Sequence, residues 1–166
     1  MMNLRKLLTT PFQKSVSKWI IILLIVVSAI GFADATFLTI EHYINKIPPC
    51  TTSGCEVVLT SSYSVIAGVP VALIGALYYL FLLILLVSYL DAKKEIFLRV
   101  ALLFTVVGFI FSVYFFSLQA FVIKAFCQYC LVSIVTSAIL FVTSVIVFIK
   151  NKAKNTQENI TDNYSV

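Results

Sequence analysis

The four cysteines of the chain fall into two pairs whose spacing could carry out thiol chemistry. Cys127 and Cys130 form a CxxC motif in "FCQYCLVS", at the start of a long apolar stretch. Residues three apart share one face of a helix, so these thiols could act together or form an accessible disulfide. Cys50 and Cys55 form a wider pair, "CTTSGC", in a connection. The two pairs could serve thiol exchange, structural bracing or zinc binding.

The position of the CxxC motif gives its two thiols different roles. Cys127 would lie in the first turn of a helix, where unpaired amides and the helix dipole favour a thiolate, and Lys124 adds positive charge nearby. We therefore expect the pKa of Cys127 to lie below its usual range. Cys130 lies one turn deeper and is expected to face the apolar interior.

Thiol exchange fits the two pairs better than a metal site. "CTTSGC" separates its sulfurs by five positions and the CxxC pair is fixed in a membrane helix, so we expect no zinc. A flexible loop pair, in contrast, could meet first a soluble partner and then the anchored pair.

The composition is that of an integral membrane protein. Of the 166 residues, 61% are hydrophobic and 11% charged, and the mean hydropathy is +1.05. Four apolar stretches of about 22 to 24 residues could each cross a hydrocarbon core about 30 Å thick as a helix. Because lipid offers backbone amides no partner, we expect an all-α bundle of four transmembrane helices. The predicted spans are Trp19–Ile40, Val69–Leu90, Val100–Val122 and Phe126–Ile149.

Basic residues gather on one side of this predicted bundle. Only Lys46 and Lys124 fall on the other side. The positive-inside rule then makes both termini cytoplasmic and all four cysteines extracytoplasmic, where disulfides form. The net charge of +5 therefore reports topology, and we expect no nucleic-acid partner. The ten basic residues on the cytoplasmic side are Arg5, Lys6, Lys14, Lys18, Lys93, Lys94, Arg99, Lys150, Lys152 and Lys154.

The first external connection, residues 41–68, is expected to form a lid of loop and half-helix over the bundle mouth. Gly54 is expected to give the turn before Cys55 freedom in φ. Pro70 is expected within the first turn of the second span, where its missing amide has no cost. Small residues of that span should allow close helix packing: Ala72, Gly75 and Ala76.

Two polar segments flank the membrane domain of residues 19–150. Residues 1–18 are basic and are expected to lie on the inner membrane surface. Residues 151–166 form a polar cytoplasmic tail, which we expect to be disordered.

Electrons that reach Cys130 need an acceptor in the membrane. The chain has one histidine, hence no haem ligand set, and no glycine-rich nucleotide loop, so a lipid-soluble quinone is the simplest choice. Asp34 is a candidate for proton delivery to the reduced quinone or for a hydrogen bond between helices. Ser64 could bond a quinone carbonyl or cap a helix. Phe126, beside Cys127, could line the quinone site.

The stretch "CTTSGCEVVLTSSYSVIAGVPVALIGALYYL", followed by "CQYC" at the head of the last span, resembles the bacterial branch of the vitamin K epoxide reductase family. The likeness runs from Ala29 to about Ser144. It rests on the order of a loop cysteine pair, a "GVP" helix start and a terminal CxxC. The resemblance implies a four-helix bundle around a quinone, with the loop pair passing electrons inward.

Residue by residue, the resemblance implies that Cys50 and Cys55 shuttle electrons, that Cys127 exchanges with Cys55, and that Cys130 faces the quinone. It also implies a reduced thioredoxin-fold partner, similar to DsbA. Many bacterial members carry a fused thioredoxin-like domain, but only about sixteen polar residues follow the fourth span here, so a separate partner is expected. Ile134 stands where mammalian members have tyrosine, which favours menaquinone or ubiquinone over vitamin K epoxide.

The expected function is a quinone-linked thiol oxidoreductase of a bacterial plasma membrane that makes disulfides for exported proteins. A second bacterial class of four-helix quinone reductase carries its CxxC in the first external connection and its wider pair in the second, the reverse of the order here. A non-enzymatic alternative is a membrane scaffold whose two disulfides brace its outer loops.

Overall fold

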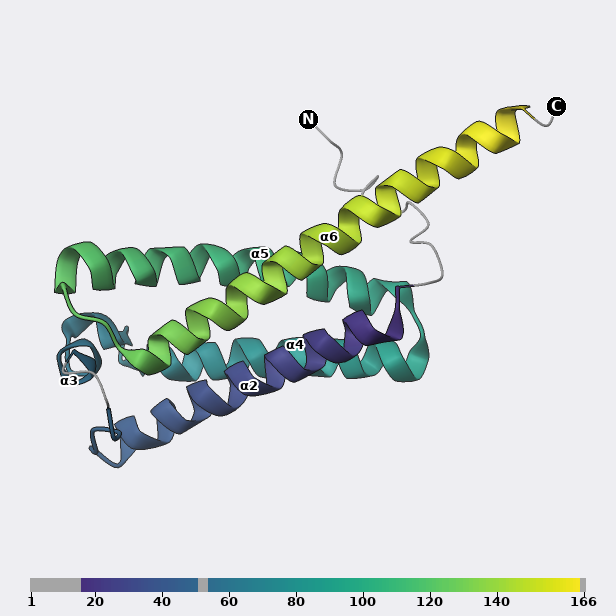
Figure 1. Ribbon diagram of the computed structural model, residues 1–166. Helices are drawn as coiled ribbons and strands as arrows, with labels where there is room; N and C mark the ends of the chain where they lie inside the picture. The colour runs from purple at the N-terminus through teal and green to yellow at the C-terminus, as the bar shows by residue number, and fades with distance from the viewer. Residues whose placement is uncertain (1–15, 51–53, 165–166) are drawn as a thin grey trace.

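Four long helices lie side by side in the computed structural model, which describes residues 16–50 and 54–164, with side chains as far as Asn151 (Figure 1). Each has a stretch long and apolar enough to cross a membrane. The predicted four-helix membrane bundle is confirmed. Most of the basic segment at residues 1–18 lies outside the described residues. The helices are α2 (Lys18–Tyr43), α4 (Val71–Ala92), α5 (Glu95–Ser117) and α6 (Gln128–Tyr164).

One half of the bundle is filled by aliphatic side chains. Leu82, Leu98, Leu102 and Leu140, which come from three different helices, are almost completely buried there. A void among Leu82, Leu102 and Leu140 has a volume of only about 10 Å³. We call this region the packed half; its close packing is what dispersion forces between helices in lipid require.

In the other half, small residues let aromatic rings lie between the helices. A Cβ atom at Gly31 would overlap the Tyr79 ring, so only glycine leaves room for that ring against α2. The Tyr79 hydroxyl group lies 3.0 Å from the Ser133 carbonyl oxygen and 2.8 Å from Thr136 Oγ1, which ties α4 to α6. The predicted small-residue face is confirmed at Gly75, where an added Cβ would lie 3.6 Å from the Ala35 Cβ.

The segment between α2 and α4 folds over one end of the bundle, beside the α5–α6 connection (Figure 1). It contains α3 (Cys55–Leu59), the 3₁₀ turn η1 (Ser62–Ser64), and an antiparallel hairpin of β1 (Val65–Ile66) and β2 (Val69–Pro70). The expected lid is therefore present, although only α3 is α-helical. Pro70 is not in the first helical turn as predicted: its ψ of 132° is extended, and the helix begins at Val71.

The connection between α5 and α6 begins with a π-helix, η2 (Leu118–Ile123). Lys124 ends it with φ of 55°, a left-handed conformation that stops helix propagation. The next helix, α6, starts at Gln128. The prediction that the chain is disordered after Asn151 is wrong, because α6 continues to Tyr164. Those residues include no glycine or proline that would end a helix.

Candidate active site

The lid brings a loop disulfide into contact with the CxxC motif. Cys50 and Cys55 are joined by a disulfide, with their Cα atoms 6.2 Å apart. Cys127 and Cys130 are free thiols. The sulfur atoms of Cys55 and Cys127 lie 3.5 Å apart, and both side chains are 0% exposed. A disulfide and a thiol at this separation need little movement for exchange.

Gly54 permits this close approach. A Cβ atom at this position would lie 2.8 Å from both the backbone nitrogen and the oxygen of Phe126, which is too close. Phe126 directly precedes Cys127, so the contact sets the lid against the chain that carries the inner thiol. The expectation that Gly54 supplies freedom in φ is wrong, because its φ is −88°. Its small size, rather than its flexibility, is what the site uses.

A second contact with α6 lies next to Cys50, the other cysteine of the loop disulfide. The Tyr129 hydroxyl donates to the Pro49 carbonyl oxygen at 3.0 Å, and the Gln128 side chain donates to the same oxygen at 3.4 Å. Pro49 is adjacent to Cys50. The first turn of α6 therefore binds the lid directly, next to the inner cysteine pair.

Cys127, which lies just before the fourth spanning helix, is set up to ionise. A hydrogen bond from the Cys130 thiol, helped by the backbone amides of Cys130 and Tyr129, lowers the pKa of Cys127 to about 7, although burial opposes this. The direction predicted for Cys127 is confirmed. The first-turn amides contribute as expected, whereas Lys124 is not among the causes.

A buried amide fixes the backbone at Cys127. The Cys127 N–H donates to the Gln119 side-chain oxygen at 3.1 Å, and the Gln119 main-chain oxygen accepts from the Ala125 N–H at 3.2 Å. Gln119 is 3% exposed. This residue was not predicted from the sequence, although an amide in a long apolar run is the same kind of signal that singled out Asp34.

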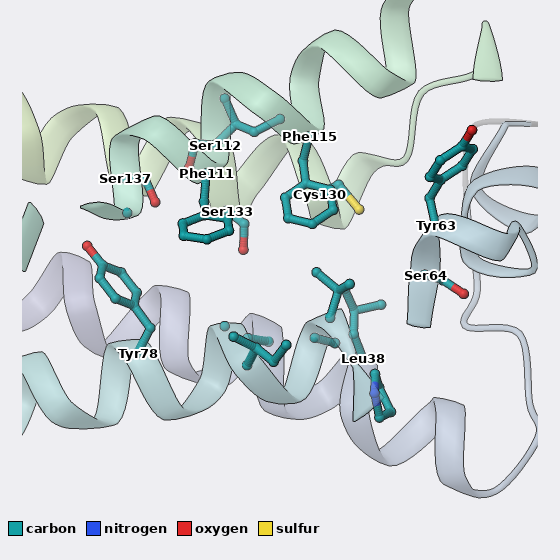
Figure 2. A pocket seen from close by; sticks show the side chains of 18 of the residues that line it. Leu38, Tyr63, Ser64, Tyr78, Phe111, Ser112, Phe115, Cys130, Ser133 and Ser137 are labelled. Carbon is teal, nitrogen blue, oxygen red and sulfur yellow. The ribbon is translucent and has the colours of Figure 1, made fainter. Parts of the chain in front are cut away.

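Cys130 opens onto a cavity of about 530 Å³ between the helices and the lid. Figure 2 shows Tyr63 and Ser64 at one end, Tyr78 at the other, and the Cys130 sulfur beside Phe115 between them. The volume lies in the range of small-molecule sites. Its wall is mainly apolar, with polar groups at His42, Ser61, Tyr63, Ser64, Tyr78, Tyr79, Ser112, Gln119, Ser133 and Ser137.

The three predicted cofactor-binding residues differ in their relation to this cavity. Ser64 lines it, but its hydroxyl donates to the Ser61 carbonyl oxygen at 2.8 Å. Asp34 is not part of the wall and accepts a hydrogen bond from the Ser133 hydroxyl at 3.2 Å, which links α2 to α6. Phe126 is also outside the wall; its ring is 43% exposed and packs against Phe116.

No group of three or more histidine, cysteine, aspartate or glutamate side chains that could hold a metal ion occurs among the described residues. The site therefore consists of thiols, a disulfide and an apolar cavity, set in a bundle of four helices able to span a membrane. These are the parts of a membrane oxidoreductase that works through thiols.

The chain belongs to the vitamin K epoxide reductase family, because the model of that family matches residues 22–145. No curated protein matches the chain. The family consists of membrane helical bundles and is associated with quinone in general. The fold described above agrees with that membership, and the matched residues include all four cysteines.

Proposed function

We propose that this protein is a quinone-linked thiol oxidoreductase that regenerates the disulfide of a separate thioredoxin-fold, DsbA-like protein. The observation that carries the proposal is the 3.5 Å separation of the Cys55 and Cys127 sulfurs. Cys130, the second thiol of that CxxC, lines the cavity. A disulfide that is partly exposed at Cys50, the buried Cys127 thiol and the cavity next to Cys130 thus form a path for two electrons.

The first half of the proposed reaction oxidises the partner. One partner thiolate attacks Cys50, which forms a mixed disulfide and releases Cys55. The second partner thiolate then breaks the mixed disulfide, so the partner leaves oxidised and the loop pair holds two thiols. Cys50 is the attacked sulfur, because Cys55 is completely buried whereas Cys50 is partly exposed.

The second half moves the electrons inward. Cys55 attacks Cys127 of a Cys127–Cys130 disulfide, which forms a Cys55–Cys127 bond and releases Cys130 as a thiolate. Cys50 then attacks Cys55, which restores the loop disulfide and releases Cys127. This ends in the arrangement described above, with the loop disulfide closed and the inner thiols free.

The final step returns the inner pair to its disulfide. Two electrons pass from the Cys127 and Cys130 thiols to a quinone, which takes up two protons and leaves as the hydroquinone. Menaquinone and ubiquinone are the proposed acceptors, and a cavity of about 530 Å³ can hold the quinone ring. Asp34, through the Ser133 hydroxyl that lines the cavity, is the proposed proton relay.

The proposed orientation places both termini in the cytoplasm and the cysteines outside a bacterial plasma membrane, as the distribution of basic residues favours. An impermeant thiol reagent applied after reduction should label Cys50, the partly exposed cysteine of the loop pair, in intact cells. Labelling confined to inverted vesicles would reverse the orientation.

The catalytic proposal is tested with the purified protein, a reduced thioredoxin-fold protein and a soluble quinone, while quinone absorbance is followed. Wild type should consume quinone, and Cys130→Ala should not. Thr143→Ala is the matched control, because this residue lies on the same helix and outside the cavity wall. Equal rates for wild type and Cys130→Ala would contradict the proposal and favour the scaffold alternative, in which the cysteines only brace loops.

A further inference from the structure

Gln119 is a buried residue that hydrogen-bonds the backbone on either side of Phe126. Its side chain is 3% exposed and lies in the π-helical turn η2, in the third spanning segment. Its main-chain and side-chain oxygens accept from the Ala125 and Cys127 N–H groups respectively. Gln119 therefore holds the connecting chain on both sides of residue 126. π-Helical turns of this kind frequently occur at functional sites.

The contact with Cys127 also determines which way the amide group points. A main-chain N–H can only donate, so the side-chain oxygen of Gln119 must face Cys127 and the NH₂ group must face elsewhere. Among the residues the structure describes, that NH₂ group has no hydrogen-bond partner, and Gln119 is part of the cavity wall. Because Gln119 lines the cavity, an occupant with an acceptor atom would give this donor a partner.

Several other polar groups in the wall already donate hydrogen bonds to acceptors within the protein. The Ser61 and Ser64 hydroxyls donate to the carbonyl oxygens of Val58 and Ser61. The Ser133 hydroxyl donates to Asp34. Gln119 is instead left with a donor next to the thiol pair, because its own acceptor contact is to Cys127.

We propose that the Gln119 NH₂ group donates a hydrogen bond to a carbonyl oxygen of the quinone while the Gln119 side-chain oxygen holds Cys127. The proposal rests on the proposed function and adds a residue that positions both reactants. As the thiols pass two electrons to the quinone, negative charge grows on the carbonyl oxygens, so a hydrogen bond to one of them strengthens.

Two variants separate the two contacts of Gln119. Gln119→Met removes both and should weaken equilibrium binding of a soluble ubiquinone analogue by about 10-fold. Gln119→Glu keeps an acceptor for Cys127 but can donate to a quinone only when protonated. Its quinone affinity should therefore approach that of wild type at low pH and fall by about 10-fold as the carboxyl group ionises.

Binding is measured on the full-length protein with both cysteine pairs oxidised, so that no quinone is reduced. Wild type over the same pH range is the baseline for the native titratable groups around the cavity: Asp34, His42, Tyr63, Tyr78 and Tyr79. Ser117→Ala is the matched control, because Ser117 lies two positions before Gln119, outside the cavity wall, and its hydroxyl donates to the Val113 carbonyl oxygen. It should bind quinone as wild type does.

Transfer of electrons from the loop pair to the inner pair, followed without quinone by thiol labelling, provides the second readout. Gln119→Glu should retain this transfer. A pH-independent affinity equal to wild type in Gln119→Glu, together with unchanged binding in Gln119→Met, would overturn the role of Gln119 and leave the proposed function standing. Absence of quinone binding by wild type would overturn both.

Discussion

The two halves of the bundle are built from the same four helices but packed in opposite ways. In the packed half, the void that leucines such as Leu82 and Leu102 line has a volume of about 10 Å³. In the half next to the lid, which we call the cavity half, the helices enclose about 530 Å³. Glycine, serine and tyrosine line the cavity half, for example Gly108, Ser133 and Tyr78. We therefore expect the packed half to determine the stability of the bundle and the cavity half to determine its reactivity.

The comparison predicts that removal of the inner thiol abolishes activity without unfolding the protein. Cys127→Ser should lower the rate of quinone reduction by about 1000-fold or more, because a hydroxyl cannot replace a sulfur in disulfide exchange. Unfolding in a detergent titration should be nearly unchanged, since the packed half is intact. A variant that retains a substantial rate would mean that electrons bypass Cys127.

A change at the lid should have the next largest effect. Gly54→Ala places a methyl group against the Phe126 backbone, which must push the lid away from Cys127. A displacement of about 1 Å can lower a rate by about 100-fold. The rate of electron transfer from the loop pair to the inner pair, measured by rapid thiol labelling, should fall accordingly.

Thr60→Ala is the control for the lid variant, because Thr60 lies in the same segment and its hydroxyl donates to the Glu56 carbonyl oxygen of the preceding helix α3. If Gly54→Ala and Thr60→Ala transferred electrons equally fast, close approach of the lid would not limit exchange.

In the packed half, a substitution is expected to lower stability and to leave activity nearly unchanged. Leu102→Ala leaves a void among buried leucines and should lower the free energy of unfolding by about 2 kcal/mol, roughly 30-fold in the unfolding equilibrium. Quinone reduction by the folded fraction should stay near the wild-type rate. Val106→Ala, on the same helix and 40% exposed, should cost much less. A large loss of specific activity in Leu102→Ala would show that the two halves are coupled.

The smallest predicted effect concerns pH. Because the pKa of Cys127 is lowered to about 7, its thiolate fraction should rise about 10-fold per pH unit below that value and level off above it. The thiolate absorbance of the wild type, after subtraction of the Cys127→Ser spectrum, measures this directly. A midpoint near 8.5, the ordinary thiol value, would exclude activation of Cys127 by the first turn of α6.

Much of the fold could be predicted from the sequence, because transmembrane helices and the connections between them depend on local composition. The four apolar stretches, the lid and the CxxC at the head of the last span all follow from patterns within about 25 residues. The small-residue face at Gly75 is also a local signal. The boundary at Pro70 was predicted wrongly, because the pairing of Pro70 with Val65 in a short hairpin delays the start of the helix to Val71.

The parts of the site that depend on distant contacts were not predictable in the same way. Whether Gly54 served by flexibility or by small size depended on Phe126, which lies far along the chain. The role of Gln119 depends on its contact with the backbone of Cys127, which no sequence pattern specifies. Phe126, which was expected to line the quinone site because it precedes Cys127, instead packs against Phe116 outside the cavity wall.

The central claim is that Cys55 and Cys127 exchange directly, and a variant in which they are the only cysteines tests it most directly. In Cys50→Ala/Cys130→Ala, mild oxidation of the membrane-embedded protein should join Cys55 to Cys127, as read by mass spectrometry of the linked peptides. The account predicts near-complete formation of this disulfide, because the two sulfurs lie 3.5 Å apart. Two cysteines that stay fully open to alkylation after unfolding would contradict it.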